Sequence, residues 1–267
     1  MNKFIAGFIG AGNMGGIIAT AVSKQVGPEK VCVCCSSPES TKSAAQRIGC
    51  LDATIEQACL SKYLFLGIKP QMAQSVLPNV AKIIENDNDC IVVSMLAGTT
   101  IETLCELCGT DRVIRIMPNT PAQVGEGVTL VCSSDSVTAD ELSEFCRIIS
   151  LMGKSDVIDE KYFDAATALS GCGPAFVYMF LEAMADGAVK CGLPRDKACE
   201  YAARTLIGAS RLALLSDKHT SELKDAVCSP GGSTIEGVLC LEKEGMRSAI
   251  MDAVCASYEK SKKLGKK

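Results

Sequence analysis

The segment Phe8–Gly16 constrains the fold of this chain more than any other stretch. It reads Phe-Ile-Gly-Ala-Gly-Asn-Met-Gly-Gly, follows an apolar run and leads into the helix-like Ile17–Val22. In a GxGxxG spacing, Gly10 permits a tight turn off a strand, Gly12 lets the backbone approach a pyrophosphate, and Gly15 lets the next helix pack closely on that strand. The alternative is a purely structural glycine turn, because the chain has 23 glycines. The position between a strand pattern and a helix pattern predicts dinucleotide binding.

The first part of the chain alternates between two patterns up to about residue 158. We expect strands at 4–9, 31–35, 63–68, 90–95, 112–116 and 127–132, and helices at 14–25, 38–48, 71–86, 100–108 and 138–151. Strands that are apolar on both faces and separated by amphipathic segments predict a parallel sheet covered on both sides. This is the α/β doubly wound dinucleotide-binding (Rossmann) fold, which we expect over residues 1–158.

After Asp159 no further stretch has the pattern of a strand. We expect helices at about 162–168, 174–191, 195–215, 219–227, 234–243 and 246–264, separated by Gly-Pro, Leu-Pro and Pro-Gly-Gly breaks. The pattern predicts an all-α domain over residues 159–267. Its small residues, as in Ala183–Ala188, favour close packing against partner helices, so we expect this domain to mediate dimerisation.

Charge and composition exclude several classes of partner. The formal charge is −4 and only 4% of residues are aromatic, so there is neither the basic surface nor the stacking platform of a nucleic-acid-binding protein. A long uncharged run, between Asp164 and Glu182, is interrupted by Gly171, Gly173 and Pro174. We therefore interpret it as a buried loop and helix and expect no membrane partner.

Sixteen cysteines lie mostly within apolar patterns such as Val31–Cys35, where cysteine acts as a small hydrophobic residue. This usage predicts a reducing, cytoplasmic location. Cys105 and Cys108 have the spacing of a zinc knuckle but lack a second pair, so we expect no metal site. The single histidine, His219, lies in a polar stretch and is expected at the surface.

The end of the second expected strand bears on cofactor choice. An enzyme that prefers NAD usually places an acidic residue there to bind the ribose 2′-hydroxyl. Here the segment Cys34–Pro38 has none, and Ser36 and Ser37 offer hydroxyls for a 2′-phosphate. NADP(H) is therefore favoured over NAD(H). NAD(H) stays an alternative, because no arginine adjoins the strand end and Glu39 is close.

Three further loops follow expected strands, where a parallel sheet places its ligands. Gly67–Pro70 and Met95–Gly98 are either parts of the site or ordinary strand-to-helix turns. Met117–Pro121 is more specific, because two prolines bracket Asn-Thr and make a stiff loop suited to a wall near the nicotinamide.

In the helical half, one glycine-rich turn has the features of an anion site. Ser233 and Glu236 have capping-box spacing, so we expect a helix to begin there. The preceding Gly231 and Gly232 leave amides at a positive helix end, which suits a small carboxylate. The alternative is a well-capped helix without a ligand.

Earlier in this half, Leu169–Ala175 ends one segment and starts a long helix.

Four motifs together resemble the pyrroline-5-carboxylate reductase family over essentially the whole chain. They are Phe8–Gly15, Val113–Pro121, Ala168–Ala175 and Leu223–Ile235. The resemblance implies hydride transfer from NAD(P)H to the C=N carbon of 1-pyrroline-5-carboxylate, which gives L-proline. It also implies homodimers, often grouped into decamers.

The resemblance also implies site residues. The residues implied for the cofactor are Ile9, Gly10, Ala11, Gly12, Asn13 and Met14 at the pyrophosphate, Ser36 and Pro38 at the adenosine ribose, and Thr54, Gly67, Ile68, Lys69, Pro70, Met95, Leu96 and Ala97 along the rest of the channel. The residues implied for the substrate are Glu160, Ala226, Val227, Gly232 and Ser233, with the catalytic Thr234 hydroxyl facing the ring nitrogen.

Three positions depart from the family pattern, and two other functions stay open. Cys172 stands where the family commonly has Ser. Ala226 stands where some members have Asn, and Thr54 stands where Asn is usual. One is a related imine or 3-hydroxyacid reductase, and the hydroxyacid enzymes usually have a catalytic lysine in the helical half, for which Lys190 is the candidate. A non-catalytic dinucleotide-binding regulator would bind NADPH without turnover.

Overall fold

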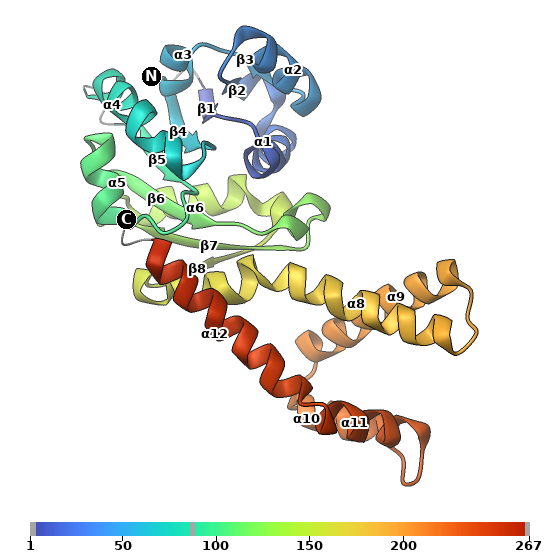
Figure 1. The fold of residues 1–267 in the computed structure, drawn as a ribbon. Coiled ribbons are helices and arrows are strands. Elements are labelled where there is room, and N and C mark those ends of the chain that lie inside the picture. The colour runs from blue at the N-terminus through green and yellow to red at the C-terminus, as the bar shows by residue number, and fades with distance from the viewer. Residues whose placement is uncertain (1–3, 86–88, 265–267) are drawn as a thin grey trace. The chain divides into compact units, whose positions relative to one another are not determined.

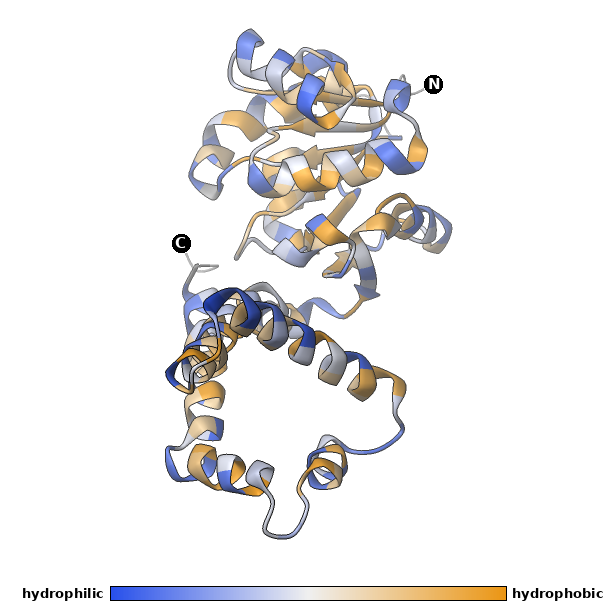
Figure 2. Cartoon of the chain, turned by 90° about the vertical axis from the view of Figure 1, so that its right-hand side faces the viewer, coloured by the Kyte–Doolittle hydropathy of each residue, from blue (hydrophilic) through white to orange (hydrophobic). Residues whose placement is uncertain are grey.

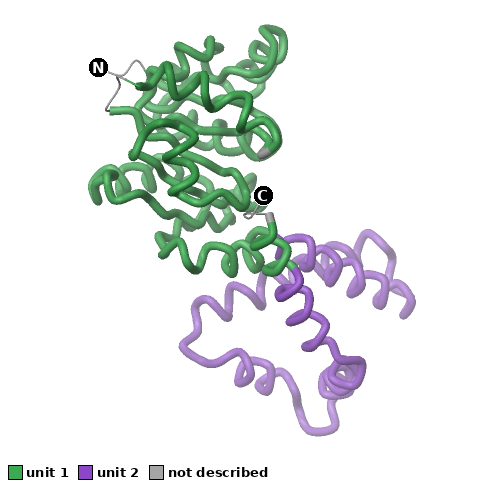
Figure 3. The backbone as a smooth tube through the Cα atoms, turned by 60° about the vertical axis from the view of Figure 1, so that its left-hand side comes forward, with its two compact units in different colours: residues 1–171, 257–267 green, residues 172–256 purple. Residues whose placement is uncertain are grey.

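The computed structural model describes residues 4–85 and 89–264 and divides the chain into two compact units. The first comprises residues 1–171 and 257–267, and the second residues 172–256 (Figure 3). The last helix, α12 (Met246–Leu264), contributes to both units. The last residue of the helix expected at 71–86 lies outside the described residues.

The first unit is built on an eight-stranded sheet in the order β3-β2-β1-β4-β5-β6-β7-β8 (Figure 1). The strands are β1 (Phe4–Ile9), β2 (Val31–Cys34), β3 (Leu51–Asp52), β4 (Ser61–Leu66), β5 (Ile91–Ser94), β6 (Val113–Met117), β7 (Gly127–Ser133) and β8 (Gly153–Val157). The first six strands have the 3-2-1-4-5-6 order of the doubly wound dinucleotide-binding fold. The predicted fold class is confirmed.

Helices cover both faces of this sheet. They are α1 (Asn13–Val26), α2 (Pro38–Ile48), α3 (Ile55–Cys59), α4 (Ala73–Ile84), α5 (Ile101–Cys108), α6 (Ala139–Ile148) and the short α7 (Phe163–Ala166). Successive strand residues point to opposite faces. Phe8 and Phe65 pack in the core under α1, α2 and α6, whereas Leu64 and Leu66 pack in the core under α3, α4 and α5. The double-sided burial explains why these strands are apolar throughout.

The far edge of the sheet differs from the sequence-based expectation. β7 runs antiparallel to β6, because the connection between them is short, and β8 then pairs parallel with β7. β8 was not expected, since this edge strand reads Gly-Lys-Ser-Asp-Val and lacks an apolar pattern. The two-residue β3 at the other edge and the five-residue α3 were also missed. The sheet is therefore mainly, not wholly, parallel.

The second unit is helical throughout. It contains α8 (Gly173–Lys190), α9 (Arg195–Leu215), α10 (Thr220–Val227), α11 (Ser233–Lys243) and the first part of α12. α8 and α9 pack closely through Ala185, Ala198 and Ala202. Large apolar side chains nevertheless stay exposed along these helices, among them Met179 and Leu214, which are 70% and 85% exposed. The hydropathy colouring of Figure 2 shows apolar segments on several of them.

The domain boundary expected at 158/159 stays a prediction. The last strand, β8, ends at Val157, and the described residues beyond it form only helices and turns. The compact units divide later, between Gly171 and Cys172, because the segment from Glu160 to Gly171 packs with the first unit. Phe163 in this segment is fully buried against β7 residues.

Among the described residues, the stretch Glu160–Lys190 is long and apolar enough to cross a bilayer, judged by length and composition alone. A single such stretch is weak evidence for a membrane span. It is interrupted by the π-helical turn Thr167–Gly171, in line with the break expected from its glycines. The expectation that this stretch is buried is wrong for the single chain, because only 11% of the apolar window lies inside.

Candidate active site

The glycine loop between β1 and α1 has the close contacts that its sequence predicts. Gly10 has φ +91°, and a Cβ there would lie 2.6 Å from the Gly67 carbonyl oxygen. A Cβ on Gly15 would lie 2.7 Å from the Gly10 carbonyl oxygen. Gly12, the N-cap of α1, differs because a Cβ there would meet nothing within 4 Å. Gly10 and Gly15 are thus needed for packing, whereas Gly12 leaves open space at a helix N-terminus, where a pyrophosphate fits.

The loop lies at the point where the strand order reverses. β1 pairs with β2 on one side and with β4 on the other. The Gly10 amide donates to the Cys34 carbonyl over 2.7 Å, and the Gly67 amide donates to the Ile9 carbonyl over 2.8 Å. These bonds hold the carboxyl ends of β1, β2 and β4 together at the switch point, where ligands of this fold bind.

A cavity of about 620 Å³ opens at these strand ends, and we call it the strand-end cavity. Eight of the residues expected at the cofactor line it: Ile9, Gly10, Ala11, Gly12, Ser36, Gly67, Ile68 and Lys69. It is also lined by Cys34, Cys35, Ser40, Ser43, Ala44, Arg47, Ile55, Met72 and Val76. None of these lining residues is an aspartate or glutamate. The cavity wall therefore has the basic side chains of Arg47 and Lys69 and no carboxylate.

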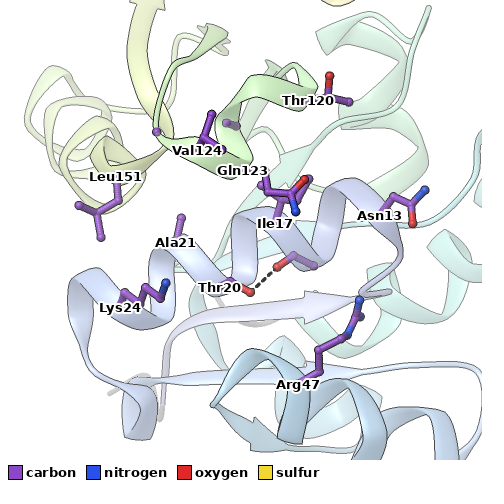
Figure 4. A pocket seen from close by; sticks show the side chains of 13 residues that line it. Asn13, Ile17, Thr20, Ala21, Lys24, Arg47, Thr120, Gln123, Val124 and Leu151 are labelled. Carbon is purple, nitrogen blue, oxygen red and sulfur yellow. Dashed lines mark hydrogen bonds between the residues drawn. The ribbon is translucent and has the colours of Figure 1, made fainter. Parts of the chain in front are cut away.

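Several expected cofactor residues lie elsewhere in the first unit. Asn13 lines a second cavity, of about 740 Å³, along the outer side of α1 (Figure 4). Met14 packs against the core, and Pro38 is the first residue of α2. Thr54 caps α3, with its Oγ1 accepting from the Gln57 amide at 3.3 Å, while the next residue, Ile55, lines the strand-end cavity. Their roles at the cofactor stay predictions.

The loop after β5 presents its residues in three different ways. Met95 packs against the core on one face of the sheet, and Leu96 is buried in the core on the other. The Leu96 amide donates to the Ser94 hydroxyl over 3.2 Å, and Ala97 is exposed. Pro70, in the loop after β4, begins a short 3-10 helix that ends at Met72.

Arg47 is the residue of this region that sequence reasoning missed. Its Nη2 donates to the Ala11 carbonyl over 2.8 Å, and it lines both cavities. In Figure 4 its side chain extends from α2 toward the N-terminal end of α1. The sequence argument considered arginines only next to the end of β2. The helical spacing of Ser40, Ser43 and Arg47, which repeats at three and four residues, is the signal that places them on one face of α2.

Glu160 makes two well-defined contacts. Its Oε1 accepts from Arg115 Nη1 on β6 and from the Ile101 amide at the start of α5, both over 2.8 Å. The Arg115 side chain is 5% exposed and lies over the Phe163 ring, 4.3 Å from its centroid. Glu160 therefore fixes the start of α5, directly after the loop at Met95–Ala97. Its expected contact with substrate stays a prediction.

Asn119 explains the stiffness expected of the Met117–Pro121 loop. This side chain is 8% exposed, donates from Nδ2 to the Ser170 carbonyl and accepts at Oδ1 from the Val128 amide, both over 2.9 Å. It thereby ties the loop to β7 and to the π-helical turn. Thr120, the next residue, lines the second cavity.

The glycine-rich turn expected to bind a carboxylate belongs to the second unit. α10 ends at Val227, Gly231 has φ +67°, and the Gly232 amide donates to the Ser229 carbonyl over 3.0 Å. α11 begins at Ser233, one residue before the expected range of 234–243, and its N-cap is Gly232. The expected capping box is wrong, because no side chain caps this helix. The turn is exposed at Ala226, Val227, Ser233 and Thr234. The amides of Ser233 and Thr234 at the start of α11 and the two hydroxyls are thus open to a ligand, whereas the Gly232 amide is already bonded within the turn.

The remaining candidates show no sign of a separate centre. In the part of the chain that the structure describes, no three His, Cys, Asp or Glu side chains are placed to hold a metal ion. All sixteen cysteines lie in that part, and none of them forms a disulfide. Cys108 is buried, and burial raises its pKa to about 12. His219 is exposed at the surface, as expected, and Lys190 is the exposed last residue of α8.

Comparisons with known proteins agree with this geometry. Residues 160–264 match the family described as pyrroline-5-carboxylate reductase dimerisation, and residues 5–98 match NADP oxidoreductase coenzyme F420-dependent. The pyrroline-5-carboxylate reductase of Pisum sativum is 39% identical over 98% of this chain and 97% of its own length. That of Escherichia coli K12 is 39% identical over 97% of this chain and 98% of its own length. A crystal structure of the Plasmodium falciparum reductase with NADP bound superposes with a TM-score of 0.88 at 32% identity, covering 99% of each chain.

The switch-point cavity and the glycine cradle define a dinucleotide-binding oxidoreductase of the doubly wound class. The full-length matches narrow this class further. The chain belongs to the pyrroline-5-carboxylate reductase family.

Proposed function

We propose that this protein reduces 1-pyrroline-5-carboxylate to L-proline with NADP(H) as the hydride donor. The observations that support it most are the close approach of Gly10 and Gly67 at the switch point and the open space around Gly12 at the start of α1. Family membership supplies the substrate class. The absence of any carboxylate from the cavity lining favours NADP(H) over NAD(H).

The residues of the first unit orient the cofactor. The amides at the start of α1 meet the pyrophosphate, and the strand-end cavity receives the adenosine. Among the residues that line this cavity, the apolar side chains of Ile55, Ile68 and Met72 suit a base, while the serines suit the ribose. When bound, the nicotinamide supplies the hydride. The protein has to position it and exclude water.

The glycine-rich turn of the second unit serves the substrate in this proposal. The amides around Gly232 and Ser233 hold the carboxylate at the positive end of α11. An imine accepts hydride readily only when its nitrogen is protonated, so a hydroxyl beside that nitrogen is the one side-chain function that the step needs. Thr234, at the second position of α11, fills this role. Neither a metal nor a histidine is required.

Assembly and location follow as further parts of the proposal. The apolar side chains exposed on the second unit, such as Met179 and Leu214, support a homodimer formed through these helices. Dimers of this kind are proposed to group into decamers. Sixteen cysteines without a disulfide among the described residues support a reducing, cytoplasmic location.

One assay tests the activity. NADPH absorbance at its reduced-cofactor band is followed with 1-pyrroline-5-carboxylate present and absent, and the product is identified as proline by chromatography. We expect NADPH oxidation that depends on substrate, with a lower KM for NADPH than for NADH. NADPH binding without turnover would instead support a regulator. NADPH oxidation only with acyclic imines, or with 3-oxo acids that are reduced to 3-hydroxyacids, would support the other alternative.

A further inference from the structure

The loop between β5 and α5, residues 95–100, lies at the carboxyl end of a parallel strand near the switch point. We call it the β5–α5 loop. A doubly wound fold binds one half of a dinucleotide on its β1–β3 half and the other on its β4–β6 half. Because the end of β2 is expected to take the adenosine ribose, the half that contains this loop takes the nicotinamide. The conformation of the loop therefore affects where the reactive ring lies.

The start of the β5–α5 loop is held beside β6. Ser94, the last residue of β5, is fully buried and is the register partner of Arg115 in the parallel pair of β5 and β6. Its hydroxyl accepts from the Leu96 amide over 3.2 Å, and Leu96 is 1% exposed. The first residues of the loop are thus fixed next to the backbone of Arg115.

The end of the loop is held by the Arg115 side chain through Glu160. Ile101, the first residue of α5, donates its amide to Glu160 Oε1, and the same oxygen accepts from Arg115 Nη1, both over 2.8 Å. A carboxylate is favoured at this position, because free amides and the positive end of the helix dipole meet there. Arg115 therefore connects to both ends of the loop, at Ser94 by strand register and at Ile101 by way of Glu160.

Arg115 is placed to position other groups and not to bind a ligand. Its side chain is 5% exposed, and its guanidinium lies over the Phe163 ring, 4.3 Å from the centroid. Its Nε is buried without a hydrogen-bond partner among the described residues. Within that part of the chain, Glu160 is the one carboxylate paired with this guanidinium. Without Arg115, the Ile101 amide alone would hold the Glu160 carboxylate.

We propose that Arg115 is a positioning residue for hydride transfer, which through Glu160 holds the β5–α5 loop in the conformation that presents the nicotinamide to the substrate. The inference rests on the proposed reaction, and it assigns Arg115 no contact with cofactor or substrate. The competing role is that of an ion pair that serves stability alone.

A second ion pair in this chain is the matched control. Arg112, the residue before β6, donates from Nη2 to Glu141 Oε1 over 2.5 Å, and Glu141 Oε2 accepts from the Thr138 amide at the start of α6. Arg112 also has a buried Nε without a partner among the described residues. It differs in place, because it lies at the amino end of β6 and the β5–α5 loop lies at the carboxyl end of the neighbouring parallel strand.

Single-turnover oxidation of NADPH at saturating 1-pyrroline-5-carboxylate measures the chemical step in the full chain. For Arg115→Met we expect a rate about 10–100-fold lower, as a misplaced reacting group predicts, with the NADPH dissociation constant from calorimetry changed by less than about threefold. Arg112→Met should keep the single-turnover rate within about twofold of the parent even where it lowers stability.

Two further measurements separate positioning from a direct role of the carboxylate. Amide hydrogen exchange, read by mass spectrometry without turnover, should be faster over residues 95–101 in Arg115→Met and unchanged there in Arg112→Met. Glu160→Gln keeps an oxygen that can accept from Ile101 and from Arg115, so its single-turnover rate should stay within about fivefold of the parent.

Three outcomes would overturn the proposal. Equal losses of rate in Arg115→Met and Arg112→Met would show that the pairs serve stability alone. Unchanged exchange over residues 95–101 in Arg115→Met would remove the loop from the explanation. A rate for Glu160→Gln as low as that for Arg115→Met would mean that the carboxylate charge acts on the reactants directly. Failure of the proposed reaction is distinct, because it would appear as absent turnover in the parent protein.

Discussion

The Arg115 guanidinium on β6 lies 2.8 Å, Nη1 to Oε1, from the Glu160 carboxylate that follows β8. The two side chains differ in burial, because Arg115 is 5% exposed and Glu160 is 33% exposed. The same Oε1 also accepts from the Ile101 amide. One carboxylate oxygen thus links the central part of the sheet to the start of α5.

This asymmetry predicts unequal costs for removing the two partners. Glu160→Ala leaves a buried guanidinium without its counter-charge and should lower the free energy of unfolding by about 3 kcal/mol. Arg115→Met leaves a carboxylate that water can reach and keeps the packing on Phe163, so it should cost about 1 kcal/mol. Urea unfolding measures both. As a control, Asp156→Asn, in an exposed pair with Lys154, should change stability by less than about 0.5 kcal/mol. A larger loss of stability for Arg115→Met than for Glu160→Ala would contradict this explanation.

Gly10 and Gly12 should respond differently to the same substitution. Gly10→Ala forces a Cβ to within 2.6 Å of the Gly67 carbonyl at φ +91°, so we expect a loss of about 2–4 kcal/mol of stability. Gly12→Ala has open space around its Cβ and should cost less than about 1 kcal/mol, yet it should weaken NADPH binding at least tenfold by occupying the pyrophosphate site.

Thermal unfolding with and without NADPH tests this pair of variants. The stabilisation that NADPH gives the parent protein should be reduced in Gly12→Ala even though its ligand-free melting temperature is close to that of the parent. Full stabilisation of Gly12→Ala by NADPH would show that the pyrophosphate does not approach this residue.

Thr234 should affect turnover rather than folding. Its side chain is exposed and makes no described hydrogen bond, so Thr234→Ala should leave stability within about 0.5 kcal/mol of the parent. Loss of a hydrogen bond to a charged nitrogen corresponds to about a 10–150-fold lower kcat, with NADPH affinity unchanged. Thr220→Ala, at the exposed start of α10, is the matched control. An unchanged kcat for Thr234→Ala would remove this hydroxyl from the mechanism.

Buried thiols give the fold a predictable sensitivity to alkaline pH. Burial raises the pKa of Cys59, Cys108 and Cys132 from 9.0 to about 12 in each case. Because the folded pKa lies above the unfolded one, the stabilisation is complete below pH 9 and is lost as the pH rises toward 12. Between pH 8 and pH 10 each thiol should lower the free energy of unfolding by about 1 kcal/mol.

The contribution of one thiol can be isolated by comparison. Urea unfolding of Cys108→Ala at pH 8 and pH 10 should show a decline about 1 kcal/mol smaller than that of the parent. Cys191→Ser, at an exposed position, should decline as the parent does. Equal declines in the parent and in Cys108→Ala would mean that the Cys108 thiol ionises as readily in the folded protein as in the unfolded chain.

The sequence predicts those parts of the fold that depend on local spacing. The glycine loop is one, because Gly10, Gly12 and Gly15 act within a single turn, and the alternation of apolar strands with helices is another. β8 could not be found in this way, since an edge strand with little burial has no apolar period. The antiparallel direction of β7 follows from the short connection between β6 and β7, which the apolar pattern of the strands alone does not show.

The site was predicted unevenly for a related reason. Residues next to strand ends, such as Ser36 and Gly67, line the cavity where expected. Arg47 was missed because it reaches the cavity from a later turn of α2, and Ile55 lines the cavity in place of the neighbouring Thr54. The capping box at Ser233 failed because α11 already begins at Ser233, so that its N-cap is Gly232, which has no side chain to accept a capping bond.

Transfer of a labelled hydride tests the central claim most directly. The protein is incubated with 1-pyrroline-5-carboxylate and NADPH that carries deuterium at the transferable C4 position, and the product is analysed by mass spectrometry and NMR. We predict proline that carries one deuterium at ring carbon C5, formed in equal amount to the NADPH consumed. Proline without deuterium, or NADPH bound but not consumed, would contradict the assignment.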